Sequence, residues 1–314
     1  MTDSSKTTGI PRDNVGSMSF DIGRAASFLA AHGRVLDRRR FALLTGGTSP
    51  TDRAAVLAAV DGYRNGDGGY SWGIEPDLRA PESQPAGALH ALEAIGDAGA
   101  ETTSATPQLF DWLDSVTLPD GGLPFALPIA NPVACAPFWV ESDPEDSSLQ
   151  ITAGVAAQAH RLARDAQGAR EHPWLARVTR YCFDAIDQMD EKPFAYVLSF
   201  ALQFLDAAAD SHPEAHELLQ RLGKYVPADG AIPVEGGAAG ETLRLLDFAP
   251  EPGRPVRSLV DEAAVVADLD RLENGQQSDG GWVVDFTSYS EAAALEWRGY
   301  ATVSAVAILR ANGR

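Results

Sequence analysis

Four short glycine loops recur along this chain at a nearly constant spacing, and they constrain the fold more than any other feature. They are Asp67-Gly68-Gly69, Asp120-Gly121-Gly122, Asp229-Gly230-Ala231 and Asp279-Gly280-Gly281. Successive loops lie about fifty residues apart, and only the middle gap is about twice as long. A period of this length with one turn per period is typical of a repeat architecture, in which one repeat has lost its turn motif.

The segments between the loops have the composition and periodicity of α-helices. Residues 194–209 are almost entirely apolar, which indicates a helix buried on most sides, whereas residues 258–272 carry many charges. Helices are also predicted for residues 20–33, 51–60, 84–95, 146–163, 213–222 and 290–311. Strand patterns are scarce, so the predicted fold class is all-α.

Polar and apolar helices alternate, and this alternation is consistent with two architectures. Pairs of one polar and one apolar helix can stack into an open solenoid, or they can close into a ring with the apolar helices inside. Periodicity alone does not choose between the two. The chain of 314 residues accommodates about six hairpins at the observed period, and this number favours the ring.

The charge balance restricts the partners that we expect. The chain has 25 basic and 44 acidic residues and a net charge of −19. Nucleic acids and anionic membranes attract clusters of Lys and Arg, so neither is an expected partner. No apolar run is long enough for an integral membrane segment. We expect residues 1–16 to be a disordered tail without a signal peptide, residues 17–314 to form a single domain, and the protein to be cytoplasmic.

Two of the glycine loops belong to a longer motif. The last loop reads Gln277-Ser278-Asp279-Gly280-Gly281-Trp282, and Asn65-Gly66-Asp67-Gly68-Gly69-Tyr70 is a degenerate copy. This motif resembles the repeated Gln…Trp motif of the squalene–hopene cyclase, class II terpene cyclase and protein prenyltransferase superfamily. The resemblance spans roughly residues 20–312. It implies an (α/α)6 toroid of about six helical hairpins, with six inner helices around a cavity and six outer ones.

An acidic stretch, Asp143-Pro144-Glu145-Asp146, lies at the head of an apolar helix and is followed by Ser147. Class II terpene cyclases carry Asp-x-Asp-Asp-Thr-Ala at such a place, and the middle acid protonates an alkene or epoxide. The resemblance implies Glu145 as the proton donor, tuned by Asp143 and Asp146, with Glu145 in place of the usual middle Asp. Neighbouring carboxyls in a pocket of low dielectric cannot all ionise, so one stays protonated. The simpler interpretation is a helix start with Asp146 as N-cap.

A carbocation also needs aromatic walls, because the faces of aromatic rings stabilise cations. The aromatic residues that we expect to bind substrate are Trp72, Phe138, Trp139, Trp282, Trp297 and Tyr300. The alternative for each of them is that the ring fills the core.

No metal and no cofactor are expected for this reaction, and Mg²⁺ would enter only with a substrate that carries a diphosphate. The zinc prenyltransferases of the superfamily need an Asp-x-Cys pair and a His after a Tyr, whereas here Ala301 follows Tyr300 and no Asp-x-Cys exists. The Asp-Asp-x-x-Asp motif of class I terpene synthases is also missing. Residues 69–73 match the G-x-S-x-G pattern, but no predicted strand precedes them as a nucleophile elbow requires.

The sequence therefore predicts a class II terpene cyclase-like protein that cyclises a hydrophobic isoprenoid substrate by protonation in the cavity of a toroid. The alternative is a non-catalytic toroid that binds a lipid or a protein. The strong acidity of the chain favours a neutral substrate. The direction of Glu145 distinguishes the hypotheses: into the cavity for the enzyme, into solvent for the binding module.

Overall fold

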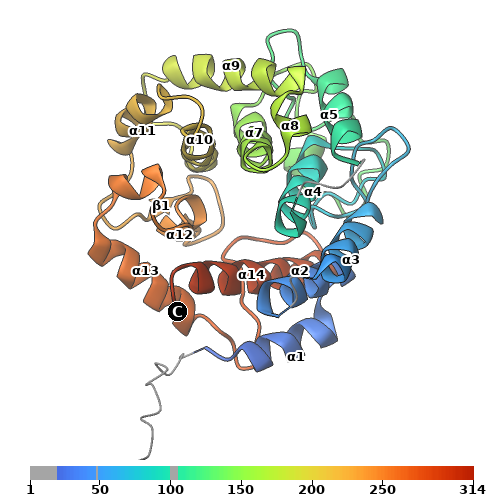
Figure 1. The fold of residues 1–314 in the computed structure, drawn as a ribbon, viewed down its shortest axis with the longest axis vertical. Coiled ribbons are helices and arrows are strands. Elements are labelled where there is room, and N and C mark those ends of the chain that lie inside the picture. Colours follow the sequence, from blue (N-terminus) through green and yellow to red (C-terminus); the bar gives the residue numbers. More distant parts are fainter. Residues whose placement is uncertain (1–19, 47–48, 100–104) are drawn as a thin grey trace, which may run out of the picture.

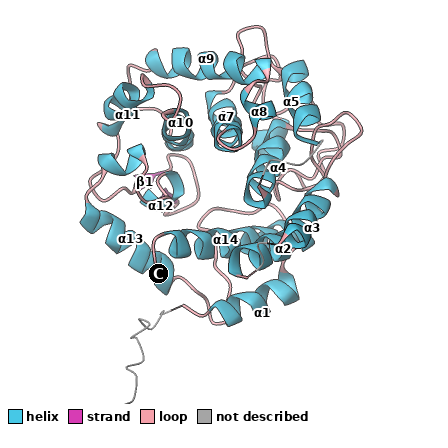
Figure 2. Cartoon of the chain, viewed as in Figure 1, coloured by secondary structure: helices cyan, strands magenta, loops and turns pink. Residues whose placement is uncertain are grey.

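The computed structural model describes residues 20–46, 49–99 and 105–314, and it is built almost entirely from helices (Figures 1 and 2). Within these ranges the strands are limited to one short antiparallel pair, β1 (Ile232–Pro233) and β2 (Thr242–Leu243). The predicted all-α class is confirmed. The predicted tail, residues 1–16, lies outside the described residues.

Most helices have three or more turns. These are α1 (Ile22–His32), α2 (Val35–Thr45), α3 (Pro50–Asp61), α4 (Pro85–Ala98), α5 (Ala105–Val116), α7 (Leu149–Ala163), α9 (Pro173–Asp187), α10 (Ala195–Ala208), α13 (Glu262–Asn274) and α14 (Glu291–Ala311). The shorter helices are α6 (Pro137–Val140), α8 (Gln167–Arg170), α11 (Ala215–Gly223) and α12 (Leu245–Phe248). None of the described helices combines the length and the apolar composition needed to cross a bilayer.

Side-chain caps determine where several helices begin. The hydroxyl oxygens of Ser49 and Ser290 accept backbone N–H groups in the first turns of α3 and α14, which would otherwise lack partners. α7 begins at Leu149, and its N-cap residue is Ser148. The predicted N-cap role of Asp146 is therefore wrong, because two further residues separate Asp146 from the helix.

The helices surround a common centre in two layers (Figure 1). Helices α4, α7 and α10 lie nearer the centre, and α5, α9 and α11 lie outside them. The inner three bury most of their residues, whereas the peripheral α3 and α13 bury only a few. Apolar helices thus form the inner wall, and the polar faces of the others meet solvent.

Contacts between helices run around the centre and return to their start. Helix α2 contacts α4, α4 contacts α7, α7 contacts α10, and α10 contacts α12. Helix α13 contacts both α12 and α14, and α14 contacts α1 and α2. The first and last helices therefore lie against each other, whereas an open solenoid would leave its two ends apart.

All four glycine loops form the same turn, as their sequence predicts. In each, the Asp Oδ1 accepts the backbone N–H two residues later, at 2.9 to 3.1 Å. The intervening glycine has a φ between 70° and 98°, a conformation that glycine adopts without strain. The loop motif is therefore a structural signature of the repeat.

Three of these loops also pack closely on a peripheral helix, whereas Gly230 of the third loop packs against Leu245 of α12. A Cβ at Gly68 would lie 2.8 Å from the Gln108 carbonyl oxygen in α5, and one at Gly121 would lie 3.3 Å from the Arg177 carbonyl oxygen in α9. A Cβ at Gly280, in the last loop, would collide with the Arg24 carbonyl oxygen in α1. The last loop thus contacts the first helix, α1, in the same way as the first two loops contact α5 and α9.

The turn missing from the regular spacing is the link between α9 and α10, residues 188–194. It lacks the Asp-Gly-Gly sequence but keeps a similar contact with the next outer helix. Arg221 of α11 donates to the Ile186 carbonyl at 2.7 Å, and the Tyr225 hydroxyl donates to the Asp190 carbonyl at 3.1 Å. The long middle gap in the sequence therefore contains one further helix-to-helix turn, which lacks the Asp-Gly-Gly sequence.

Candidate functional site

A cavity of about 1260 Å³ lies at the centre of the helices. Its walls come from the inward faces of α4, α7, α10 and α14, together with the loops that precede α4, α7, α12 and α14. Pockets for small molecules usually measure about 300–1,000 Å³. The volume is thus sufficient for a ligand larger than a typical metabolite.

One end of the cavity is aromatic. Trp139 stacks on Phe125 with ring centroids 4.6 Å apart, and Phe138 lies 5.7 Å from Tyr289 in an edge-to-face arrangement. Trp297 of α14 belongs to the same wall and makes an edge contact with Phe286. Segments that precede α7 and α14 in the chain therefore meet here to form one aromatic surface.

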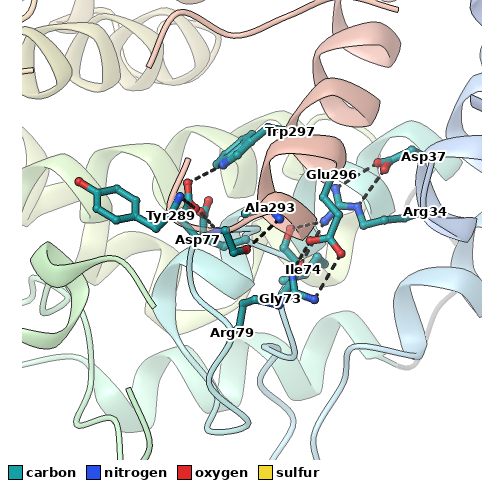
Figure 3. Close-up of polar contacts among 12 residues, drawn as sticks. Arg34, Asp37, Gly73, Ile74, Asp77, Arg79, Tyr289, Ala293, Glu296 and Trp297 are labelled. Atoms are coloured by element: carbon teal, nitrogen blue, oxygen red, sulfur yellow. Dashed lines mark hydrogen bonds and ion pairs between the residues drawn. The ribbon is translucent and has the colours of Figure 1, made fainter. Parts of the chain in front are cut away.

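Two buried carboxyls, those of Glu75 and Asp77, adjoin this surface from the loop between α3 and α4. They are only 6% and 3% exposed, and both belong to the cavity wall. The Oδ2 of Asp77 accepts the indole N–H of Trp297 at 2.7 Å, and its Oδ1 accepts the backbone N–H of Tyr289 at 2.8 Å (Figure 3). The Oε1 of Glu75 accepts the backbone N–H of Asp77 at 3.0 Å.

Two arginines hold this acidic loop against its neighbours (Figure 3). Arg34 pairs with the buried Asp37 and also donates to the Ile74 carbonyl at 2.8 Å, which ties the loop to the start of α2. Arg79 makes two hydrogen bonds with the carboxylate of Glu296 in α14. The positions of Glu75 and Asp77 are therefore fixed by elements from both ends of the chain.

His90 of α4 lies between two carboxylates. Its Nε2 is 3.0 Å from the Oε2 of Glu75, and its Nδ1 is 3.1 Å from the Oε2 of Glu93. Burial alone would lower the pKa of His90, but the charges and hydrogen bonds of the two carboxylates outweigh it and raise the pKa to about 9. At neutral pH His90 is thus an imidazolium that donates to both acids.

The chain of hydrogen bonds continues from Glu93 to Tyr300. The Tyr300 hydroxyl donates to the Oε1 of Glu93 at 3.1 Å, and burial raises the pKa of Tyr300 well above its usual value. Burial opposes ionisation of Glu93, but the charges of His90 and Arg40 keep its pKa below the usual range. Arg40 itself pairs with Asp97 at 2.6 Å. The cavity wall therefore carries a continuous hydrogen-bonded chain, Glu75–His90–Glu93–Tyr300.

Asp77 differs from its neighbours in the direction of its pKa shift. Burial raises the pKa of Asp77, and the negative charge of Glu75 adds to this increase. The hydrogen bonds from Tyr289 and Trp297 favour the ionised form and reduce the shift without reversing it. Asp77 therefore keeps its proton to a higher pH than an ordinary aspartate, as a general acid requires.

The acidic stretch predicted as the catalytic site lies on the surface. Asp143, Glu145 and Asp146 are exposed, and none of them contributes to the cavity wall. The Oδ1 of Asp143 accepts the backbone N–H of Glu145 at 2.9 Å within a local turn, and the neighbouring Ser147 donates to Asp120 at 2.7 Å. The structure thus brings the three acids together but not to the cavity.

The six aromatic residues predicted to bind substrate fall into two groups. Those that line the cavity are Phe138, Trp139, Trp297 and Tyr300. Trp72 lies outside the cavity wall and is 55% exposed. Trp282 is also outside it, buried in the core with its indole N–H donating to the Leu272 carbonyl at 2.8 Å.

The buried acids and the histidine were not predicted from the sequence. A signal was nevertheless present in residues 85–98, where His90, Glu93 and Asp97 interrupt an Ala- and Leu-rich helix at a spacing of three and four residues. Polar side chains at this spacing share one face of a helix. Glu75 and Asp77 lie shortly after the first glycine loop, and this position in the repeat was a second signal in the sequence.

These groups bind one another rather than forming a metal site. Among the residues that the structure describes, no group of three or more His, Cys, Asp or Glu side chains is arranged to hold a metal ion.

Comparison with known proteins adds information on the fold alone. No family model matches the chain, and no curated protein matches it. One solved structure, described as the crystal structure of a protein from Actinoplanes, is similar over 93% of this chain and 98% of its own, with a TM-score of 0.55 and 14% sequence identity. The likeness shows that a chain of nearly the same extent follows a related helical path.

Proposed function

We propose that this protein is a class II terpene cyclase-like enzyme that protonates a hydrophobic, isoprenoid-like substrate in the central cavity. The observation that carries the proposal is the buried carboxyl of Asp77, with a raised pKa, in an aromatic cavity wall. The proposal keeps the reaction class expected from the sequence. It moves the proton donor from the exposed Glu145 to Asp77.

We also infer that the helices form the six hairpins of an (α/α)6 toroid. The pairs would be α1–α2, α3–α4, α5–α7, α9–α10, α11–α12 and α13–α14. The alternation of peripheral and central helices supports this pairing, as does the contact of the last glycine loop with the first helix. In the superfamily that the sequence resembles, the hydrophobic substrate occupies the cavity of such a toroid.

The proposed reaction begins with transfer of the Asp77 proton to one carbon of a substrate double bond. The π electrons form the new C–H bond, and the other carbon becomes a cation. The π electrons of a second double bond close a ring onto this cation, and loss of a proton from the final cation restores a neutral product. Before the first step burial and the charge of Glu75, held in place by His90, keep Asp77 protonated, and the hydrogen bonds from Tyr289 and Trp297 stabilise the carboxylate that the proton transfer leaves behind.

The aromatic end of the cavity has the second property that this reaction needs. Trp297 binds Asp77 directly, and Tyr289 and Phe138 lie beside it. A cation near the face of such a ring is stabilised by about 0.5–2 kcal/mol, and several rings act together in a site without water. The proton donor and the groups that stabilise the resulting cation therefore share one wall.

The experiment is a turnover assay on a panel of linear isoprenoids, namely alkenes, alcohols and epoxides, with products identified by gas chromatography and mass spectrometry. On any substrate that the wild type cyclises, Asp77→Asn should lower the rate by at least about 100-fold, because general acid catalysis contributes this much. Glu145→Gln is the matched control and should retain the rate. Wild-type turnover by Asp77→Asn would refute the assignment of the donor.

Two observations favour a second candidate, a non-catalytic lipid-binding toroid. Glu145 is exposed to solvent, which is the direction expected for a binding module and not for an enzyme that uses the acidic stretch. Both carboxylate oxygens of Asp77 already accept hydrogen bonds that join its loop to the segment around α14. In this alternative Asp77 is a structural link and the cavity only stores its ligand. A lipid found by mass spectrometry in the purified protein, without turnover of it or of any panel member, would favour this second function.

A further inference from the structure

Arg161 of α7 is a cation without a partner in the cavity wall. It lines the cavity, and its guanidinium makes no hydrogen bond or ion pair with any residue that the structure describes. The other arginines of the wall are engaged: Arg40 by Asp97, Arg53 by the Ala98 carbonyl and Arg164 by Asp210. Among the described arginines of the wall, Arg161 is therefore the one that has neither an ion pair nor a hydrogen bond of its guanidinium.

The acids that influence Arg161 at longer range do not satisfy it. They are Glu251, Asp206 and Glu93. Their own partners are Arg164 for Glu251, Arg254 for Asp206 and His90 for Glu93. Burial lowers the pKa of Arg161, which shows that its guanidinium has lost water without gaining a close counter-charge. Arginine nevertheless stays protonated at neutral pH.

A second donor lies beside Arg161 on the same helix face. Gln158 precedes Arg161 by three residues, also lines the cavity, and makes no side-chain hydrogen bond with the described residues. The guanidinium offers two parallel N–H groups, which match the oxygens of a carboxylate or phosphate, and the amide adds a further N–H. The two side chains together form a recognition site for an anion.

The position of Arg161 along α7 suits the head group of an elongated ligand. Ile151, near the start of α7, lines the same cavity. Arg161 lies ten residues further along, which is about 15 Å at the rise of an α-helix. A ligand held at Arg161 therefore has room to extend its hydrocarbon body along the cavity.

We propose that Arg161 and Gln158 bind an anionic head group, a carboxylate or a phosphate, on the ligand of the central cavity, whose hydrocarbon body extends toward Trp297. This inference rests on the proposed function, since both assign one hydrophobic ligand to the cavity. It changes the expected substrate class from neutral to anionic. The acidity of the whole chain suggested a neutral substrate, but the local donor pair outweighs it.

The test compares matched probes by titration calorimetry on the full chain: farnesoic acid, its methyl ester, farnesol and farnesyl monophosphate. The acid or the monophosphate should bind at least about tenfold more tightly than the ester and the alcohol, because a hydrogen bond to a charged group contributes this much. Preference for the monophosphate over the acid would identify a phosphate head group, and the reverse preference a carboxylate. Either result supports the inference.

Variants show which residue is responsible for the preference for the anionic probes. Arg161→Gln should remove the preference for the anion and leave the affinity for farnesol within about twofold, whereas Arg161→Lys should retain part of it. Arg53→Gln is the control, because Arg53 lines the same wall but its guanidinium donates to the Ala98 carbonyl. It should keep the full preference.

Two outcomes would overturn the inference, and they are distinguishable. If neither farnesoic acid nor farnesyl monophosphate binds the wild type more tightly than the methyl ester and farnesol, the anion site is contradicted and the proposed function stays intact. Binding of none of the four probes contradicts both. The comparison of acid with ester uses the wild type alone, so it does not depend on the folding of any variant.

Discussion

The indole N–H of Trp297 donates a 2.7 Å hydrogen bond to the carboxylate of Asp77, a residue 220 positions earlier in the chain. This bond joins the loop before α4 to the last helix, α14. It therefore lies where the end of the chain meets its beginning, and it also fixes the acid that we propose as proton donor. The same contact therefore contributes both to the meeting of the two chain ends and to the site.

Loss of this bond should reduce stability. Trp297→Phe keeps an aromatic ring but leaves a buried carboxylate oxygen without its donor, and we expect it to lower the free energy of unfolding by about 1–3 kcal/mol. Trp72→Phe is the control, since Trp72 is exposed and its indole binds only Asn65. Urea denaturation measures both. Equal losses for the two variants would contradict a structural role for the bond between Trp297 and Asp77.

Replacement of His90 should lower the free energy of unfolding by more than Trp297→Phe does, because it leaves two buried carboxylates without their shared cation. We expect His90→Gln to lower the free energy of unfolding by about 3–5 kcal/mol, as is typical when one partner of a buried ion pair is removed. His216→Gln, at an exposed histidine, should change it by less than about 0.5 kcal/mol. A loss in His90→Gln no larger than in this control would argue against the charged cluster.

The same cluster predicts how stability depends on pH. The pKa of His90 is about 9 in the folded protein and near its ordinary value of 6.5 when unfolded. A raised folded pKa contributes stability that is complete below the unfolded value and is lost as the pH rises through the folded value. The difference in unfolding free energy between wild type and His90→Gln should therefore shrink between about pH 7 and pH 10, by at most about 3 kcal/mol. A difference that stays constant over this range would show that His90 is not charged in the folded protein.

The glycine of the last loop provides a test of ring closure. Gly280 has a φ of 97°, and a Cβ there would collide with the Arg24 carbonyl oxygen of α1, whereas Gly236 has a φ of 77° and no atom within 4 Å of its Cβ position. Both alanine variants introduce the strain of a left-handed conformation, which destabilises the fold by about 1–2 kcal/mol. Only Gly280→Ala also disturbs α1. In urea denaturation, Gly280→Ala should thus lower the free energy of unfolding by at least about 1 kcal/mol more than Gly236→Ala does. Equal effects would mean that the contact with α1 contributes nothing.

The repeat could be predicted from the sequence because its signal is local. An Asp followed two residues later by a backbone N–H forms the same turn wherever it occurs, and all four loops do so. The apolar helices α4, α7 and α10 were also predicted from composition. Helices α2, α5 and α9 were not predicted. Helix α2 has no clear apolar face, so its packing on its neighbours settles its structure, whereas α5 and α9 carry an amphipathic periodicity that the prediction missed.

The site could be predicted only in part, because its residues meet through the tertiary structure. Trp297 and Phe138 were expected near a substrate, and both line the cavity. The acids were sought in the most conspicuous acidic motif, around Glu145, but a motif before a helix does not reveal whether its side chains face the cavity or solvent. Glu75 and Asp77 are close in the sequence, and His90 shares a helix face with Glu93, but only the fold brings Glu75 to His90 and Asp77 to Trp297.

The most direct test of the central claim is to follow the proton that starts the reaction. We would incubate an isoprenoid that the wild type cyclises in deuterated water and measure deuterium in the product by mass spectrometry, for the wild type, Asp77→Asn and Glu145→Gln. We expect one deuterium per product molecule from the wild type and from Glu145→Gln, and no labelled product from a folded Asp77→Asn. Labelled product from Asp77→Asn, together with loss of labelled product in Glu145→Gln, would contradict this assignment. The exposed acids of residues 143–146 would then be the source of the proton.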